Sequence, residues 1–183
     1  MTRVVAGTFK GRRLRTPPGD GTRPTSDRVR ESLFASLTSS FGGLDDLRVL
    51  DLFAGSGAIG IEAVSRGAAH ADLVDADRHA VRTIRANLTE LGIEKARVHA
   101  MKADRFLRTA PLRPYDLVVL DPPYAMPTAE VAALVAVLAD PAWCEPDGLI
   151  VVERSSRDRF TWPEGIDARD ERAYGETTLW YGR

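Results

Sequence analysis

VLDLFAGSGAIG, residues 49–60, joins an apolar run to a turn in which Gly55, Gly57 and Gly60 follow G-x-G-x-x-G spacing. The apolar run predicts a buried strand, and the residues after the turn predict a helix. Glycines at such a junction permit a tight turn and let a ligand approach the backbone beside a helix N-terminus. The stretch therefore predicts a strand–turn–helix unit that binds a nucleoside-containing cofactor.

Outward from this unit, strand-like and helix-like segments alternate along the chain. The expected strands are 48–53, 71–75, 97–101, 116–120, 149–153, 167–174 and 177–182. The expected helices are 26–40, one that follows the glycine turn to about residue 66, 78–91, 104–109 and one that starts at Pro127. Five alternations predict an α/β fold with a mostly parallel sheet and helices on both faces. The last two strands flank a short turn, so we expect an antiparallel C-terminal hairpin.

The charge of the 183-residue chain is divided unevenly. Residues 1–30 hold eight basic and two acidic side chains, a net of +6, whereas residues 31–183 hold 17 and 24, a net of −7. This asymmetry favours a nucleic-acid-facing N-terminal end over a solvated basic tail.

Residues 3–16, RVVAGTFKGRRLRT, are typical of a basic β-hairpin. We expect residues 1–20 to form this hairpin, a substrate-binding extension of one larger domain, residues 21–183. The candidate contacts to nucleic-acid phosphates are Lys10, Arg12, Arg13 and Arg15, which the resemblance given below makes candidate RNA contacts.

Several classes of protein do not fit the composition. Cys144 is the single cysteine, so no intramolecular disulfide can form, and its surroundings do not suggest a nucleophile. No apolar run approaches the length of a membrane span, and the first residues lack a signal-peptide pattern. The three histidines show no metal-ligand spacing. We expect a cytoplasmic protein that needs no metal.

Three acidic residues follow or lie within the expected strands near the glycine turn. Asp75 lies 20 residues after Gly55, where a carboxylate can accept hydrogen bonds from ribose hydroxyls. Asp51 lies inside a strand, where it suits a cofactor with an ammonium and a sulfonium and repels a pyrophosphate. Asp104 is placed to accept from an adenine amino group. The glycine spacing leaves both NAD and S-adenosylmethionine open, and the acids favour S-adenosylmethionine.

The tetrapeptide DPPY, Asp121–Tyr124, stands at the C-terminal end of the fourth expected strand, where open parallel sheets bind ligands. Pro122 and Pro123 stiffen the loop and remove two N–H donors, so the Asp121 and Pro122 carbonyls stay available as acceptors. A carboxylate and a fixed carbonyl that accept both protons of an exocyclic amine would localise the nitrogen lone pair for attack on a methyl group. Tyr124 offers a face on which a flipped-out base can stack.

Two stretches carry a resemblance to known families. DLFAGSGAIGIEA, residues 51–63, together with DPPY, is similar to class I S-adenosylmethionine-dependent methyltransferases that act on exocyclic amines. RVVAGTFKGRRLRTP, residues 3–17, followed by RPTSDRVRESLFASL, residues 23–37, resembles the RsmD family of bacterial 16S rRNA guanine-N2 methyltransferases. The resemblance extends over nearly the whole chain.

The resemblance implies a Rossmann-like sheet of seven strands and methylation of N2 of one guanine in 16S rRNA, by direct transfer and within the small ribosomal subunit. It implies a catalytic set of Asp121, Pro122, Pro123 and Tyr124. The implied cofactor contacts are Arg23, Thr25, Arg30, Asp51, Phe53, Gly55, Gly57, Asp75 and Asp104. Glutamate is common in the family where this chain has Asp75, and the shorter aspartate can still accept from ribose. Nothing in the sequence requires a dimer, so we expect a monomer.

Three other functions remain open from the residues. An N6-adenine methyltransferase acting on DNA or RNA would share the amine-acceptor chemistry, because Tyr124 can stack on either purine. An NAD-dependent oxidoreductase would use the glycine turn, but DPPY would have no role in it and no Tyr-x-x-x-Lys pair is present. A non-catalytic RNA-binding module would not require DPPY.

Overall fold

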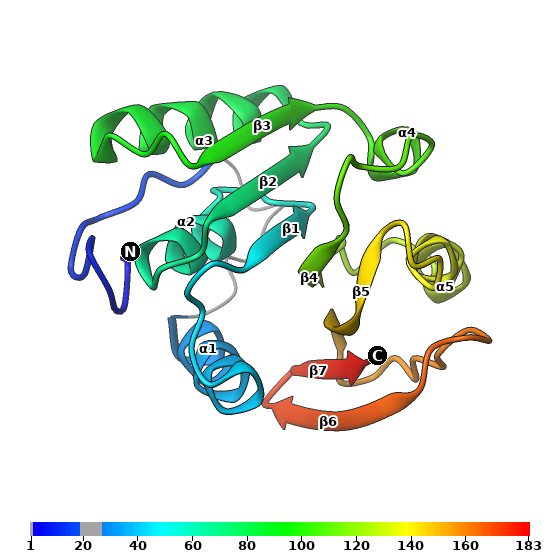
Figure 1. The fold of residues 1–183 in the computed structure, drawn as a ribbon. Helices are drawn as coiled ribbons and strands as arrows, with labels where there is room; N and C mark the ends of the chain where they lie inside the picture. The colour runs from blue at the N-terminus through cyan, green and yellow to red at the C-terminus, as the bar shows by residue number, and fades with distance from the viewer. Residues whose placement is uncertain (1, 19–26) are drawn as a thin grey trace.

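A seven-stranded sheet runs through the centre of the computed structural model, which describes residues 2–18 and 27–183 (Figure 1). The strands are β1 (Arg48–Leu52), β2 (His70–Asp75), β3 (Ala96–Ala100), β4 (Tyr115–Leu120), β5 (Cys144–Ser155), β6 (Ala168–Tyr174) and β7 (Thr177–Gly182). Their order is β3-β2-β1-β4-β5-β7-β6. Strands β1 to β5 pair in parallel, and β7 is antiparallel to both β5 and β6. The predicted Rossmann-like sheet with an antiparallel C-terminal hairpin is confirmed.

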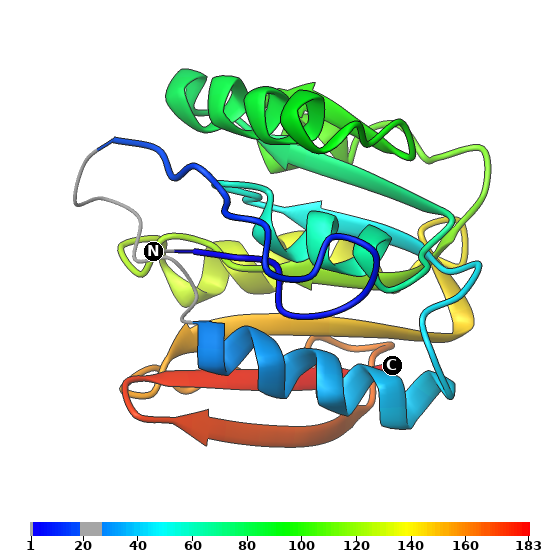
Figure 2. The ribbon, with the colours of Figure 1, turned by 90° about the vertical axis from the view of Figure 1, so that its left-hand side faces the viewer.

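Helices cover both faces of the sheet (Figures 1 and 2). They are α1 (Asp27–Phe41), α2 (Ala58–Ser65), α3 (Arg78–Leu91), α4 (Ala103–Phe106) and α5 (Thr128–Val137). Phe34 of α1, Ile61 of α2 and Ile84 of α3 belong to one buried cluster. Ala103 of α4 and Val131 of α5 belong to a second cluster on the other face. No helix in the described ranges has the length and apolarity that a membrane crossing needs.

Helix α3 shows how local sequence sets the elements. The side chain of Asp77 caps its start by accepting from the backbone N–H groups of His79 and Ala80, each at 2.8 Å. Gly92 ends it with φ of 66°, the left-handed conformation that glycine adopts without penalty. The predicted bounds of this helix, 78–91, are therefore confirmed.

Other boundaries differ from the expectation. Strand β5 begins at Cys144 rather than at residue 149, because the pairing of β4 with β5 contains an irregularity between Tyr115 and Leu117 that lets it extend. Residues 3–16 turn back on themselves as expected, but only one antiparallel bridge, Arg3 to Arg13, forms there. Val4 and Leu14 of this N-terminal hairpin are buried in the first cluster. The division into a hairpin and a larger domain at residue 20 stays a prediction.

Candidate functional site

Three carboxylates lie at the C-terminal edge of three neighbouring strands. Leu52 of β1 pairs with Val74 of β2 and with Leu120 of β4. The residues that follow these two partners, Asp75 and Asp121, therefore lie on either side of the end of β1. Asp51 lies one position deeper, in β1. Its pKa is raised to about 8, first by burial and then by the negative charges of Asp121 and Asp75. The three acids predicted from separate motifs thus form one electrostatically coupled group.

The glycine turn ties these acids to the backbone. The Gly60 N–H donates to one oxygen of Asp51 at 3.0 Å, and the Gly55 N–H donates to Asp75 at 2.8 Å. Phe53 has φ of 66°, and Gly57 has φ of 78° at the start of α2, so the chain reverses sharply here. A Cβ on Gly60 would lie 2.5 Å from the Leu73 side chain. That glycine therefore serves close packing of α2 on the sheet.

Asp75 and Asp104 are the acids predicted to hold an adenosine group. Asp75 is half-buried, and burial raises its pKa despite hydrogen bonds from the N–H groups of Asp77 and Gly55. A carboxylate oxygen can accept more than one hydrogen bond, so Asp75 can also accept from a ligand hydroxyl. Asp104 is exposed on α4, where Arg108 lies 3.8 Å away. Their contacts to ribose and adenine stay predictions.

A cationic ligand fits this group of acids. The Oδ1 atom of Asp51 is buried and has no hydrogen-bond partner among the described residues. A buried carboxylate oxygen without a donor is costly, and a bound ammonium would satisfy it. The same ligand would relieve the repulsion between Asp51, Asp75 and Asp121. The residues present therefore fit S-adenosylmethionine and do not fit a pyrophosphate.

The DPPY tetrapeptide follows directly after β4, at the same end of the sheet as the three acids. Asp121 is half-buried, Pro122 is buried, and Tyr124 is 39% exposed. Among the residues that the structure describes, no hydrogen bond reaches the carbonyl of Pro122. The Tyr124 hydroxyl lies 2.8 Å from Oγ1 of Thr177, at the start of β7. An acceptor carbonyl and an accessible aromatic ring thus stand beside the acid group.

Arg154, in β5, is a further site residue that no motif in the sequence indicates. Its side chain is buried, and it donates to the carbonyls of Pro123 at 3.5 Å and Met126 at 2.9 Å. Asp158 accepts from the same guanidinium at 2.8 Å. Arg154 thereby fixes the loop that carries Tyr124. Its signal in the sequence was an arginine directly after the run LIVVE, but its contacts to the loop that follows β4 are 26 to 31 residues away.

The N-terminal hairpin is anchored to α2. Glu62 is fully buried and accepts from the N–H groups of Val5 at 2.7 Å and Ala6 at 2.9 Å. Gly7 packs so closely that an added Cβ would lie 1.8 Å from the backbone oxygen of Ser65. These anchors are not evident from the sequence, in which Glu62 is an ordinary helix residue.

The four candidate RNA contacts are exposed on this hairpin, as expected. Arg15 pairs with Glu90 of α3 at 3.1 Å, and its backbone N–H donates to Asn87. Lys10, Arg12 and Arg13 lie in the turn of this hairpin and at the start of its second half. Their role in RNA binding stays a prediction.

The Arg30 side chain lies in the protein interior and not at the C-terminal ends of the strands, where the acids lie. Its guanidinium donates to the carbonyl of Arg3 and to Asp27, and Glu62 lies 3.8 Å away. These contacts join α1, the hairpin and α2, so a structural role accounts for them. Arg23 and Thr25, the other two candidates from the same motif, lie outside the described residues.

The structure also connects two histidines that showed no pattern in the sequence. His70 and His99 each lie within hydrogen-bond distance of Asp72, at 3.0 and 2.7 Å, and the Tyr115 hydroxyl donates to the same carboxylate. Burial alone would raise the pKa of Asp72, but these hydrogen bonds and the histidine charges outweigh it and lower the pKa.

Comparisons with known proteins agree with this geometry. The family model described as "Conserved hypothetical protein 95" matches residues 2–183. The chain is 42% identical over 154 residues to "Putative rRNA methyltransferase YlbH" of Bacillus subtilis, covering 82% of this chain and 81% of that protein. It is 40% identical over 151 residues to "Ribosomal RNA small subunit methyltransferase D" of Escherichia coli K12, covering 82% and 73%. The solved structure of "Putative methyltransferase yhhF" from Escherichia coli superposes with a TM-score of 0.84 at 35% identity, covering 99% of this chain and 96% of that one.

Proposed function

This chain belongs to the RsmD family of S-adenosylmethionine-dependent ribosomal RNA methyltransferases, and we propose that it methylates the exocyclic N2 amine of one guanine in 16S rRNA. The observation that carries the proposal is the position of DPPY. Asp121 follows β4 at the strand edge where Asp51 and Asp75 also lie. Asp121, which would accept from the amine, thus lies next to Asp51, which would bind the cationic end of the cofactor.

S-adenosylmethionine, when bound, supplies an electrophilic methyl group on a sulfonium. Asp51 would accept from its ammonium, Asp75 from its ribose hydroxyls, and Asp104 from its adenine amino group. Phe53, Gly55 and Gly57 would shape the turn around the methionine part, with Arg23 and Thr25 proposed for its carboxylate. Arg30 stays a candidate for that carboxylate, although its observed contacts are internal.

The guanine amine would face the DPPY loop. The Asp121 carboxylate and the Pro122 carbonyl would accept its two N–H groups, so that the nitrogen lone pair points toward the methyl group. Asp121 would take the proton that the nitrogen loses after transfer. Tyr124 would stack on the base, and Pro123 would keep the loop stiff. The chain's contribution is positioning and exclusion of water, with no covalent enzyme intermediate.

The substrate we propose is 16S rRNA within the small ribosomal subunit or an assembly intermediate, bound by a single chain in the cytoplasm. Lys10, Arg12, Arg13 and Arg15 would contact RNA phosphates. Fixed orientation of the hairpin by Glu62 supports this part of the proposal.

The deciding experiment measures methyl transfer from labelled S-adenosylmethionine to small subunits purified from cells that lack this protein, followed by nucleoside analysis. We expect the label in N2-methylguanosine. Label in N6-methyladenosine would keep the chemistry and overturn the base. A fluorescence titration with NADH that saturates, without S-adenosylmethionine binding, would overturn the cofactor as well.

A further inference from the structure

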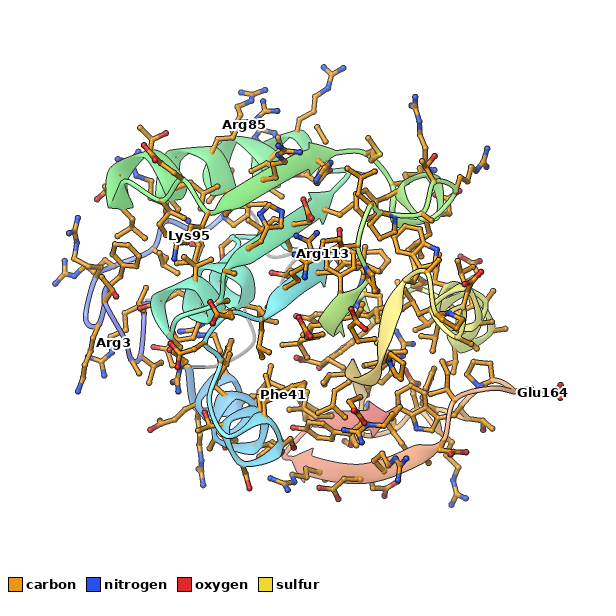
Figure 3. All side chains as sticks on the ribbon, viewed as in Figure 1. Arg3, Phe41, Arg85, Lys95, Arg113 and Glu164 are labelled. Atoms are coloured by element: carbon orange, nitrogen blue, oxygen red, sulfur yellow. The ribbon has the colours of Figure 1, made fainter. Side chains whose placement is uncertain are left out.

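Helix α3 carries three arginines that the proposed site does not use. Arg78, Arg82 and Arg85 are four and three residues apart, so they lie along one side of the helix. All three are exposed, and none forms an ion pair with another described residue. Figure 3 shows Arg85 reaching outward from α3 at the rim of the molecule.

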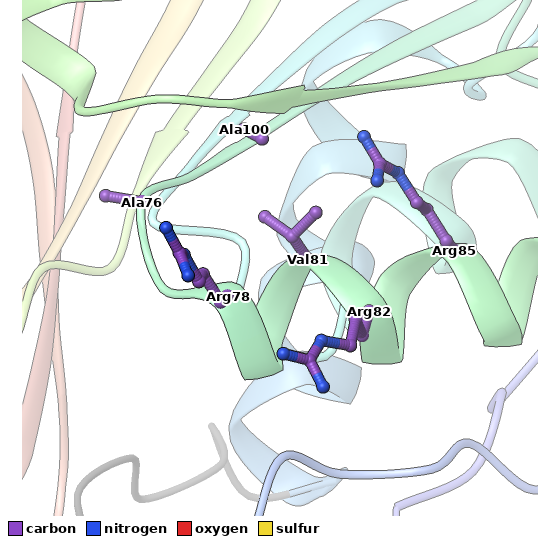
Figure 4. A pocket seen from close by; sticks show the side chains of 6 residues that line it. All are labelled: Ala76, Arg78, Val81, Arg82, Arg85 and Ala100. Carbon is purple, nitrogen blue, oxygen red and sulfur yellow. The ribbon is translucent and has the colours of Figure 1, made fainter.

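The three arginines line a cleft of about 280 Å³ together with Ala76, Val81 and Ala100 (Figure 4). Val81 lies between the Arg78 and Arg85 side chains, and Arg82 adds a third positive charge on the outer side of the same helix.

The cleft adjoins the proposed cofactor site. Ala76 directly follows Asp75, and Ala100 is the last residue of β3, four residues before Asp104. S-adenosylmethionine carries no phosphate, and its adenosine part is neutral. Its carboxylate belongs to the methionine part, proposed for the glycine turn, so the adenosine end next to this cleft offers the arginines no counter-charge.

Guanidinium forks bind phosphate oxygens bidentately, which makes arginine the usual phosphate contact in RNA-binding proteins. We propose that this cleft binds backbone phosphates of the RNA substrate, as a second phosphate site besides the hairpin. The inference rests on the proposed function for the identity of the RNA. The chemical class of the ligand, a phosphodiester strand, follows from the cleft itself.

Helix α3 contacts the hairpin and also lines the cleft. Arg15 and Arg12 of the hairpin contact Glu90, and Asn87 binds the Arg15 backbone, within two turns of Arg85. Helix α3 thereby links the basic hairpin to the strand edge where the base is modified. An RNA strand held by the hairpin could be held a second time next to the site.

The test compares two double variants. Arg82→Gln with Arg85→Gln removes two of the three charges and leaves Arg78, the arginine nearest the Asp75 loop, unchanged. Arg113→Gln with Arg169→Gln is the control, because Arg113 precedes β4 and Arg169 lies in β6, the opposite edge strand of the sheet. All four positions are exposed, so we expect unchanged unfolding temperatures.

The measurements are the affinity for 16S rRNA over a series of KCl concentrations, the KM for small subunits, and the affinity for S-adenosylhomocysteine. For the cleft variant we expect the slope of log affinity against log salt to fall by about two, since roughly one counterion is released per phosphate contact. The KM should rise several-fold with kcat and cofactor affinity unchanged. The control variant should match the wild type.

Equal salt slopes in the two double variants would overturn the inference. So would a loss of S-adenosylhomocysteine binding without any change in RNA affinity, because the cleft would then belong to the cofactor site. The outcome is separable from the proposed function. If the wild type makes no N2-methylguanosine but the slope difference persists, the cleft is an RNA site and the assigned base is wrong.

Discussion

The backbone N–H of Gly60 donates to one carboxylate oxygen of Asp51, and the other oxygen of that buried carboxylate has no hydrogen-bond partner among the described residues. Half-satisfied carboxylates are costly inside a protein, and they persist where a ligand completes them.

Stability should depend on the ionisation of Asp51. Burial raises its pKa from 3.8 to about 8, so between these values the folded protein holds a proton that the unfolded chain releases. The free energy of unfolding then falls as pH rises through this window, by up to about 1.4 kcal/mol per pH unit. Asp51→Asn cannot ionise at this position, so its free energy of unfolding should not fall in this way. Measured by urea unfolding, the difference between Asp51→Asn and the wild type should rise by roughly 2 kcal/mol from pH 6 to pH 8. Asp147→Asn, at a side chain 98% exposed, is the control. Parallel pH profiles for wild type and Asp51→Asn would contradict the prediction.

Asp121→Asn should lower kcat and spare cofactor binding. The amide keeps the size of the carboxylate but replaces one acceptor oxygen by a donor, which cannot receive an N–H of the guanine amine. We expect a loss of about 100-fold or more in single-turnover methyl transfer. Calorimetry with S-adenosylhomocysteine checks that the cofactor site is intact. Near-normal turnover would remove the acceptor role from Asp121.

Tyr124 should act through its ring. Stacking of a base on an aromatic side chain contributes about 1–3 kcal/mol, so Tyr124→Ala should raise the KM for subunits roughly tenfold. Tyr124→Phe keeps the ring and loses the contact to Thr177, and Thr177→Val loses the same contact from the other side. Both conservative variants should stay within a few-fold of the wild type. An equal defect in Tyr124→Phe and Tyr124→Ala would assign the role to the hydroxyl instead.

Arg154→Lys should reduce kcat because the DPPY loop loses its support. A planar guanidinium reaches Pro123, Met126 and Asp158 together, whereas one ammonium cannot match that fork. Asp158→Asn is the matched variant, since it weakens the ion pair and leaves both carbonyl contacts. We expect both variants to lose stability and only Arg154→Lys to lose kcat. Loss of kcat in both, in proportion to stability, would indicate a purely structural arginine.

Gly7→Ala should disturb the hairpin and spare the cofactor site. Gly7 and Gly11 both have φ of 81°, but a Cβ at Gly7 would collide with the Ser65 backbone, whereas nothing lies within 4 Å of one at Gly11. Both alanine variants carry the same backbone strain. We expect only Gly7→Ala to weaken 16S rRNA binding, with S-adenosylhomocysteine affinity unchanged in each. Equal RNA affinities in the two variants would show that hairpin placement does not matter for binding.

Much of this fold is encoded locally. The bounds of α3 depend on an Asx cap at Asp77, an apolar stripe and a left-handed glycine at 92, all of which lie within the helix or next to it. The glycine turn after β1 and the prolines after β4 likewise depend on backbone preferences of a few neighbouring residues. Right-handed crossovers between such units then leave little choice for the parallel part of the sheet.

The sequence by itself therefore determined the elements, the sheet class and the candidate acids, since these depend on periodicity and on turn residues close to one another in the chain. Only the tertiary structure decided that Arg154 supports the DPPY loop, that Glu62 anchors the hairpin, and that Arg30 lies inside. Glu62 contacts Val5 and Ala6, which precede it by 57 and 56 positions, and Arg154 contacts Pro123, which precedes it by 31 positions. A buried charge must find its partners among groups that folding brings near, and no local pattern specifies which groups those are.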